Sequence, residues 1–272
     1  MSTPGSDAAF AGSIPELYDN LLVPMIFEPY AADLARRVAA LNPSRVLETA
    51  AGTGVVMRAM ARALPASTEL VATDLNQAML DRAAAIGVSR PVRWQQADAM
   101  RLPFDDASFD VVVCQFGVMF FPDKAHAFAE ARRVLRPGGV LLFNVWDRIE
   151  ENEFIHTATA ALAELFPADP PQFMQRTPHG YFDRELIARD LANAGFRAAP
   201  RFETMAARSR ATSARSAATG YCQGTPLRNE IEARSPAGLA EATAVCAAAI
   251  AARFGEGPIE GKIQAHIVSV QN

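Results

Sequence analysis

Three acidic residues, each at the end of a predicted strand, have the types and spacing that suggest chemistry. Glu48 ends the first apolar strand, Asp74 follows the second and Asp98 follows the third. The turn Gly52-Thr-Gly54 lacks two Cβ atoms and lets a backbone approach a ligand closely. A glycine turn before a helix, with an acid about twenty residues later, can hold a nucleotide by its ribose diol. Two cofactors fit such a site, a dinucleotide and S-adenosylmethionine.

Strands and helices alternate between residues 45 and 147, which is typical of a doubly wound parallel sheet. Strands are predicted at 45–48, 69–73, 92–97, 109–116 and 140–146, then at 202–206 and 263–270. The fold class we expect is therefore α/β, with a doubly wound, mostly parallel seven-stranded sheet and a helical cap. Ligands bind at the carboxyl ends of the strands in such sheets, so the three acids should converge.

The connecting helices have recognisable boundaries. The helix after the fourth strand is expected at 124–135, ended by Pro137-Gly138-Gly139. Residues 14–38 are predicted to be helical, with a break near Pro24 and Pro29. We expect an N-terminal helical cap segment over 1–40 and a main domain over 41–272. Cap insertions are expected at about 150–182 and 214–254.

The composition is that of an ordinary globular protein. The 272 residues are 50% hydrophobic and 21% charged, and the formal net charge of −4 creates no field that draws the chain to nucleic acid. Five arginines cluster, and we interpret them as a solvated face: Arg197, Arg201, Arg208, Arg210 and Arg215. We expect a small-molecule substrate and no nucleic-acid partner, and the sequence leaves the oligomeric state open.

Cysteine usage and apolar runs indicate the compartment. Three cysteines that are far apart favour a reducing cytoplasm over a disulfide framework: Cys114, Cys222 and Cys246. Residues 1–12 lack the basic start and apolar run of a signal peptide. The longest apolar stretch, around 242–252, has about half of the roughly 20 residues that a bilayer span requires. We therefore expect a cytoplasmic protein with no membrane partner.

The glycine turn by itself is a weak signal, and its context separates the two cofactors. A dinucleotide site would need a third glycine three residues on, where this chain has Met57. Five motifs then follow in order: Val46-Leu-Glu-Thr-Ala-Ala-Gly-Thr-Gly54, Ala72-Thr-Asp74, Ala97-Asp-Ala-Met-Arg-Leu-Pro-Phe104, Ser108-Phe-Asp-Val-Val-Val-Cys-Gln-Phe116 and Val134-Leu-Arg-Pro-Gly-Gly-Val-Leu141. Together they resemble the class I S-adenosylmethionine-dependent methyltransferases, especially the branch related to ubiquinone/menaquinone biosynthesis methyltransferases.

This resemblance implies a role for each matching position. Gly52 and Gly54 would line the loop under the methionine part of the cofactor, and Glu48 would help to hold its ammonium group. Asp74 would accept both ribose hydroxyls, and Leu75 would pack against adenine. As an alternative, each acid could be a solvated strand-end carboxylate, and Asp74 could cap the helix that follows it.

The remaining matched positions lie further along the sheet. By the same resemblance, Asp98 and Ala99 would meet the adenine edge, and Gln115 and Phe116 would sit beside the methionine and the methyl group. Asp98 could instead simply begin a turn. The family usually has glycine where this chain has Ala50, which we also assign to the loop. An alanine is tolerable there if it keeps φ below zero.

Methyl transfer from a sulfonium requires little covalent help, because orientation alone can lower the barrier by roughly 7–11 kcal/mol. A general base is optional, and no histidine pair has metal-ligand spacing. Tyr18 and His179 are the candidates for such a base, although both could equally be structural. The cap is rich in phenylalanine and methionine, which favours an apolar or aromatic acceptor. An NAD(P)-dependent oxidoreductase and a non-catalytic S-adenosylmethionine-binding regulator remain as alternatives.

Overall fold

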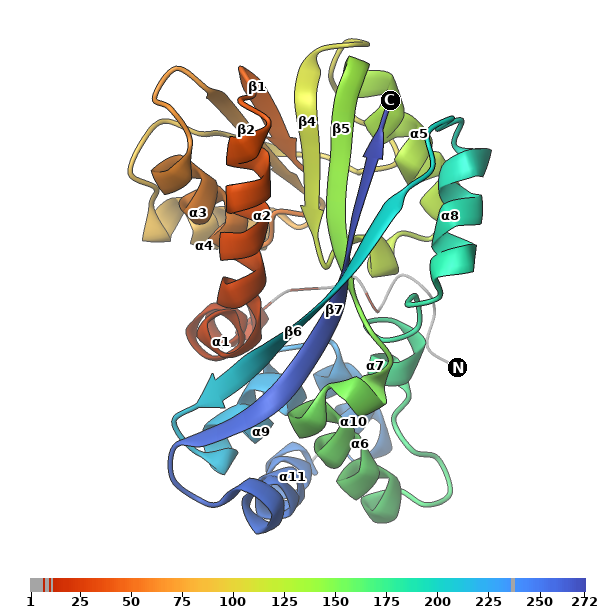
Figure 1. Cartoon of the computed structure of the whole chain (residues 1–272). Helices are drawn as coiled ribbons and strands as arrows, with labels where there is room; N and C mark the ends of the chain where they lie inside the picture. The colour runs from red at the N-terminus through yellow and green to blue at the C-terminus, as the bar shows by residue number, and fades with distance from the viewer. Residues whose placement is uncertain (1–6, 8–9, 11, 236–237) are drawn as a thin grey trace. The chain divides into compact units, whose positions relative to one another are not determined.

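The computed structural model describes residues 7, 10, 12–235 and 238–272. The prediction that residues 1–12 are not a signal peptide therefore concerns residues that lie largely outside the described ones. Within them, seven strands form one sheet (Figure 1). The strands are β1 Arg45–Glu48, β2 Glu69–Asp74, β3 Arg93–Gln96, β4 Phe109–Gln115, β5 Leu135–Trp146, β6 Arg201–Ala211 and β7 Ile259–Gln271. The helices are α1 Ile14–Leu17, η2 Tyr18–Phe27, α2 Glu28–Ala40, α3 Val55–Ala63, α4 Gln77–Ile86, η3 Val118–Phe120, α5 Lys124–Val134, η4 Ile149–Glu151, α6 Glu153–Leu165, α7 Phe173–Arg176, α8 Arg184–Asn193, α9 Ala214–Gln223, α10 Leu227–Arg234 and α11 Leu239–Phe254.

The strand order β3-β2-β1-β4-β5-β7-β6 confirms the predicted fold class. β1 pairs in parallel with both β2 and β4, β2 pairs in parallel with β3, and β4 pairs in parallel with β5. The arrows of β6 and β7 run in opposite directions, so the sheet is mostly but not wholly parallel (Figure 1). The chain order reverses between β1 and β4, which is the topological switch point where such sheets bind ligands.

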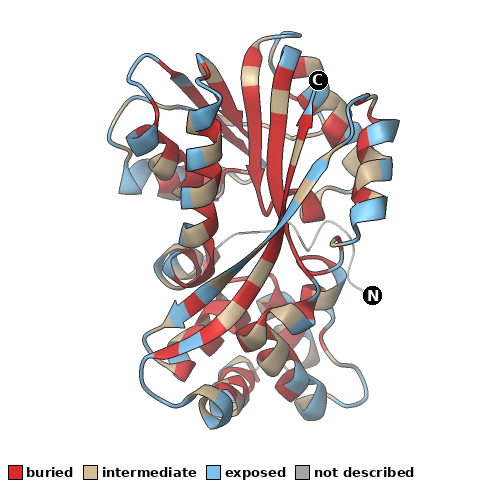
Figure 2. Cartoon of the chain, in the orientation of Figure 1, coloured by how far each residue is buried: buried red, intermediate tan, exposed pale blue. Residues whose placement is uncertain are grey.

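The described chain divides into two compact units. Unit 1 contains Met1–Phe27, Trp146–Gly180 and Ala206–Ala265, and unit 2 contains Glu28–Val145, Tyr181–Met205 and His266–Asn272. Within unit 2, α2 packs against α3, and α5 packs against α8. The central strands β4 and β5 are buried over most of their length (Figure 2). This burial explains their nearly continuous apolar sequence, since side chains on both faces of a covered strand lose contact with water.

The fifth strand begins earlier than its sequence indicates. The helix α5 ends at Val134 and β5 starts at once at Leu135, so Pro137-Gly138-Gly139 lies inside the strand. Phe109 pairs with Leu135 but Val111 pairs with Val140, a register shift that leaves extra residues on β5. Gly138 has a φ of +81°, a conformation that glycine adopts without strain. The glycines expected to end a helix therefore form a bulge instead.

The N-terminal helical stretch changes from one helix to another between its prolines, because η2 ends at Phe27 and α2 begins at Glu28. α1, η2 and α2 follow one another directly, and η2 is a π-helix that contains Pro24. An α-helix interior would place the proline ring against the carbonyl of an earlier turn. The wider π-helical turn accommodates Pro24, and Pro29 falls in the first turn of α2, where proline is tolerated. The predicted break corresponds to the boundary between η2 and α2, across which the backbone stays helical.

Helices α6, α9 and α11 form the centre of unit 1, and α9 also packs against η2. Gly220 on α9 permits this approach, because a Cβ there would lie 3.1 Å from the Leu22 side chain. The thiols of Cys222 and Cys246 are buried in the same unit, and neither forms a disulfide. No single helix among the described residues is long and apolar enough to cross a bilayer, and α10 and α11 pass that test only as a pair bent by 117°.

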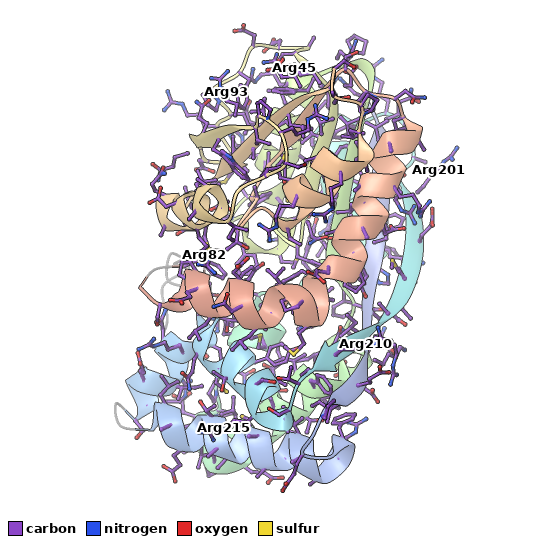
Figure 3. All side chains as sticks on the ribbon, turned by 90° about the vertical axis from the view of Figure 1, so that its left-hand side faces the viewer. Arg45, Arg82, Arg93, Arg201, Arg210 and Arg215 are labelled. Carbon is purple, nitrogen blue, oxygen red and sulfur yellow. The ribbon has the colours of Figure 1, made fainter. Side chains whose placement is uncertain are left out.

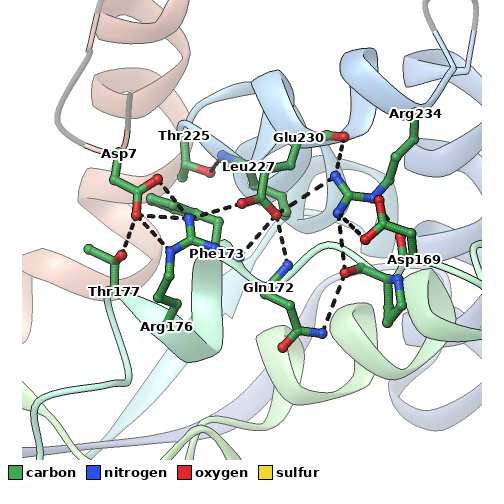
Figure 4. Close-up of polar contacts among 11 residues, drawn as sticks. Asp7, Asp169, Gln172, Phe173, Arg176, Thr177, Thr225, Leu227, Glu230 and Arg234 are labelled. Atoms are coloured by element: carbon green, nitrogen blue, oxygen red, sulfur yellow. Dashed lines mark hydrogen bonds and ion pairs between the residues drawn. The ribbon is translucent and has the colours of Figure 1, made fainter. Parts of the chain in front are cut away.

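A buried carboxylate ties α7 to α10 in unit 1 (Figure 4). Glu230 accepts hydrogen bonds from the backbone N–H groups of Gln172 and Phe173 at 2.7 and 3.2 Å, and from Arg176 at 2.9 Å. Arg176 also donates to Asp7 at 2.7 Å. The carboxylate thus satisfies backbone donors at the start of α7, where a short helix supplies no acceptors of its own.

The arginines of the predicted solvated face are exposed. Arg208 and Arg210 (the latter labelled in Figure 3) are 52% and 70% exposed and both pair with Glu260, at 3.6 and 2.6 Å. Ion pairs this exposed contribute little to stability. The predicted solvated face is confirmed at these two residues.

Candidate functional site

The loop after β1 turns through three left-handed residues. Ala50, Gly52 and Gly54 have φ values of +51°, +55° and +82°. Gly54 is required twice over, because a Cβ on it would also lie 2.8 Å from the ring of Trp94. The loop is anchored by the Ala51 N–H, which donates to the Thr73 carbonyl on β2 at 2.9 Å. The backbone geometry of the loop therefore explains why Gly52 and Gly54 are glycines.

The prediction that Ala50 keeps a negative φ was wrong. A left-handed alanine costs roughly 1–2 kcal/mol, which explains why glycine would be preferred at this position. The loop nevertheless keeps its hydrogen bonds, including Gly54 N–H to the Ala51 carbonyl at 2.9 Å. Strain of this kind persists where surrounding contacts impose the conformation. Ala50 lies against Gly117, on which a Cβ would be only 2.5 Å from the Ala50 Cβ.

Asp74 stands at the end of β2 and organises the loop from the side. Its carboxylate accepts the Gly52 N–H at 2.8 Å on one oxygen and the Asn76 N–H at 2.8 Å on the other. The side chain is buried, and this burial raises the pKa of Asp74, while the two backbone donors oppose the rise. Each oxygen has a second lone pair, so the carboxylate can accept further hydrogen bonds from a ligand.

Glu48, at the end of β1, is only 1% exposed. Its Oε2 atom has no hydrogen-bond partner among the described residues. Burial, followed by repulsion from Asp74, raises the pKa of Glu48 well above its ordinary value, and Arg58 opposes the rise. A buried acceptor left in this state costs stability unless a ligand donates to it, and a cation would be the strongest donor.

Two polar residues, in the glycine turn and at the start of α3, were not among the predicted site residues. The Thr53 hydroxyl is buried in the glycine turn, with no hydrogen-bond partner among residues that the structure describes. Arg58, in the first turns of α3, donates from Nη1 to the Thr53 carbonyl at 2.6 Å. Thr53 lies in the motif Val46–Gly54, but only the glycines of that motif indicate a backbone conformation from the sequence alone.

The residues predicted for the adenine side lie beyond β2 and β3. Leu75 is 52% exposed, an unusual exposure for a leucine at a strand end. Asp98 is half-buried, and its Oδ1 accepts the Met100 N–H at 2.8 Å. Asp98 therefore does form the turn that was its alternative role, and its other oxygen can still accept from a ligand. Ala99, half-buried, follows it.

The end of β4 is a second strained turn, next to the loop. Gln115 and Phe116 are both buried, and Phe116 has a φ of +50°. Its N–H donates to Oδ1 of Asn144 on β5 at 2.9 Å, and its ring meets Tyr30 edge-on at 5.2 Å. Asn144 is fully buried, and its Nδ2 has no partner within the described parts of the chain. Its role was invisible in the sequence, where it interrupts an apolar strand.

All ten predicted cofactor residues belong to unit 2, whereas Tyr18 and His179 belong to unit 1. His179 is buried, and its Nδ1 lies 2.9 Å from the Asp147 carbonyl. The carbonyl can only accept, so Nδ1 carries the proton and Nε2 is the basic nitrogen. Burial lowers the pKa of His179 to about 4, so the imidazole is neutral at pH 7. Tyr18 stacks on Phe27 with ring centroids 5.0 Å apart.

Comparison with known proteins places this geometry in a family. Residues 47–143 match the family model described as a methyltransferase domain. The ubiquinone/menaquinone biosynthesis C-methyltransferase UbiE of Ralstonia pickettii is 34% identical over 170 residues, which cover 58% of this chain and 69% of that protein. UbiE of Idiomarina loihiensis is 42% identical over 102 residues, which cover 36% of this chain and 41% of that protein. The chain thus spans only about two fifths of the length of the latter.

Solved structures agree on the fold. The YcgJ protein from Bacillus subtilis aligns with a TM-score of 0.56 at 19% identity, over 90% of this chain and 98% of that one. At this identity the likeness concerns the fold alone. The strand order, the glycine loop with its acids at the switch point and the similarity to UbiE lead to one assignment. The chain belongs to the class I S-adenosylmethionine-dependent methyltransferases, in the branch of the ubiquinone/menaquinone biosynthesis C-methyltransferases.

Proposed function

We propose that this protein transfers the methyl group of S-adenosylmethionine to a small-molecule acceptor. The observation that carries the proposal is the convergence of Glu48 and Asp74 beside a glycine loop at the switch point of the sheet. The orphaned Oε2 of Glu48 fits the ammonium group of the cofactor, and Asp74 retains lone pairs for a ribose diol. The exposed Leu75 offers an apolar surface for adenine.

The cofactor supplies an activated methyl group, so the protein has to bind, orient and exclude water. Gln115 and Phe116 stand at the end of β4, next in the sheet to β1 and Glu48. Phe116 is fixed by Asn144 and Tyr30, and a fixed ring can limit where an acceptor settles. Asp98 and Ala99 remain our proposal for the adenine edge.

An apolar or aromatic acceptor is the best supported. Unit 1 holds a row of rings in which Tyr18 stacks on Phe27, Phe27 meets Trp146 at 6.0 Å and Trp146 meets His179 at 6.0 Å. Aromatic side chains of this kind favour planar ligands. The relatives are named C-methyltransferases of ubiquinone and menaquinone biosynthesis, which supports a ring carbon as the atom methylated.

His179 is our candidate for a base that removes a proton from the acceptor. Its neutral tautomer leaves Nε2 able to accept, which supports the assignment. Tyr18 is the second candidate, as a hydrogen-bond donor to an oxygen of the acceptor. His179→Gln should lower kcat with an unchanged melting temperature at pH 7, and an unchanged kcat would remove His179 from the mechanism.

Ligand-induced stabilisation tests the function directly. S-adenosylhomocysteine should raise the melting temperature, whereas NAD should not. At a hundredfold excess over Kd, the bound ligand adds about 2.7 kcal/mol to the free energy of unfolding. Stabilisation by NAD instead would support an oxidoreductase. Turnover is then measured with quinone precursors, phenols and amines, and tight binding without turnover on any of them would favour a regulator. The three buried thiols without disulfides support a reducing cytoplasm as the setting.

A further inference from the structure

The chain has only two lysines, Lys124 and Lys262, and they stand in different surroundings. Lys262 forms an ion pair with Glu151. Lys124 has no ion-pair partner among the described residues, and its Nζ donates to the Phe121 carbonyl at 3.0 Å. An ammonium group without a counter-ion loses its proton more readily than a paired one. Lys124 is therefore the more nucleophilic of the two amines, and it has no part in the proposed function.

The surroundings of Lys124 hold its amine partly out of water. α5 begins at Lys124 and packs against α8 within unit 2 (Figure 1). Lys124 is half-buried, and its Nζ lies 4.9 Å from the centroid of the Tyr181 ring. Tyr181 is buried, and its hydroxyl donates to Asp190 on α8 at 2.7 Å. The fixed ring therefore shields one side of the amine from solvent.

Opposing electrostatic effects act on this amine. Burial lowers the pKa of Lys124, whereas the charges of Asp190 and Asp123 favour the ammonium form and oppose the decrease. The contact with the Tyr181 ring also favours the cation. The N-terminus of α5, as the positive end of a helix dipole, disfavours a cation at its first residue. The balance is a lowered pKa, which means a larger fraction of neutral amine at a given pH.

We propose that Lys124 is a modification site, at which the protein accepts an acyl group from a small acyl phosphate. The neutral Nζ attacks the carbonyl carbon, the bond from this carbon to the phosphate oxygen breaks, and inorganic phosphate leaves with the electron pair. The nitrogen releases one proton to water, so the products are an amide and inorganic phosphate. The amide N–H can still donate to the Phe121 carbonyl, so the modification removes a charge and keeps this hydrogen bond.

Acetylation of the full-length folded chain by acetyl phosphate tests the proposal. Quantitative mass spectrometry of the peptides that carry each lysine gives the two rates. Lys124 should react at least about fivefold faster than Lys262, because its amine is more often neutral. In guanidinium chloride both residues lose their surroundings, and the two rates should agree within about twofold. Equal rates in the folded protein, or a preference that persists after unfolding, would overturn the proposal.

Asp190→Asn tests the electrostatic argument. The amide oxygen can still accept from the Tyr181 hydroxyl, but the negative charge that favours the ammonium form of Lys124 is lost. The acetylation rate of Lys124 should therefore rise by about two- to threefold, with no change at Lys262. Glu185→Gln is the matched control, because Glu185 is an exposed acid on the same helix, and it should change neither rate. A rate at Lys124 that does not rise in Asp190→Asn, or that rises equally in Glu185→Gln, would contradict the assignment.

Discussion

The contact between Gly117 and Ala50 allows one quantitative test of the strained loop. A Cβ on Gly117 would lie 2.5 Å from the Ala50 Cβ and 2.8 Å from the Cys114 Sγ. Ordinary contacts between carbon atoms fall near 3.5–4.0 Å, so both neighbours would have to move. Gly117 has a φ of −98°, which alanine adopts readily. Gly117→Ala should therefore destabilise the protein by overpacking alone, by about 1–3 kcal/mol.

Ala50→Gly should rescue part of this loss. It removes the nearer of the two clashing atoms and leaves the Cys114 Sγ in place. We expect Gly117→Ala to cost about 1 kcal/mol less in the Ala50→Gly background than in the parent, a coupling within the range of residues in contact. Ala50→Gly alone should change stability little, because relief of a left-handed alanine is offset by the greater freedom of glycine in the unfolded chain.

Urea unfolding of the parent, both single variants and the double variant measures the coupling from the midpoints, provided that the m-values agree. Gly257→Ala is the control, because nothing lies within 4 Å of a Cβ there, and it should stay within about 0.5 kcal/mol of the parent. An identical cost of Gly117→Ala in both backgrounds, which means an additive double variant, would refute the contact.

Three further predictions concern single carboxylates and a histidine. Asp74→Ala should weaken S-adenosylhomocysteine by about 2–4 kcal/mol in calorimetry and lower the melting temperature, since two backbone N–H groups lose their acceptor; unchanged affinity would refute the assignment. Burial lowers the pKa of His179 from 6.5 to about 4 in the folded state. The neutral imidazole therefore makes its full contribution to the free energy of unfolding above pH 6.5, and this contribution is lost as the pH falls toward 4. Over that pH range, the free energy of unfolding from urea titrations should fall by about 3 kcal/mol less in His179→Gln than in the parent. Parallel pH profiles of the two proteins would contradict this. Glu230→Ala should cost about 3 kcal/mol in the same assay, against under about 1 kcal/mol for Glu232→Ala, whose side chain is 37% exposed; equal costs would argue against the α7–α10 network.

The elements around the site could be predicted because their signals are local. β1 spans Arg45–Glu48 as expected. Strand ends in a parallel sheet meet at one edge, so the convergence of Glu48 with Asp74 followed from their positions alone. The roles of the other matched residues came from the family resemblance and remain proposals.

The differences arise where one local signal has two structural outcomes. Proline and glycine after α5 indicate a helix end, but they equally suit the bulge that β5 contains. The left-handed Ala50 could not be foreseen, because contacts with a distant turn impose its conformation. Asn144 and Arg58 acquire their meaning only from neighbours in space, on the β4 turn and the glycine loop.

The orphaned atoms at the strand ends bear on any attempt to make this protein more robust. Glu48 Oε2, Thr53 Oγ1 and Asn144 Nδ2 lack partners among the residues described, and each such atom costs about 1–3 kcal/mol. A thermostability screen in plain buffer would therefore reward aliphatic replacements at Glu48 and Thr53, but not at Asn144, whose Oδ1 accepts the buried Phe116 N–H. Under the proposed function, a variant stabilised at Glu48 would be inactive, because it would lose our proposed partner for the ammonium group of the cofactor. Directed evolution of this scaffold should select for turnover at every round.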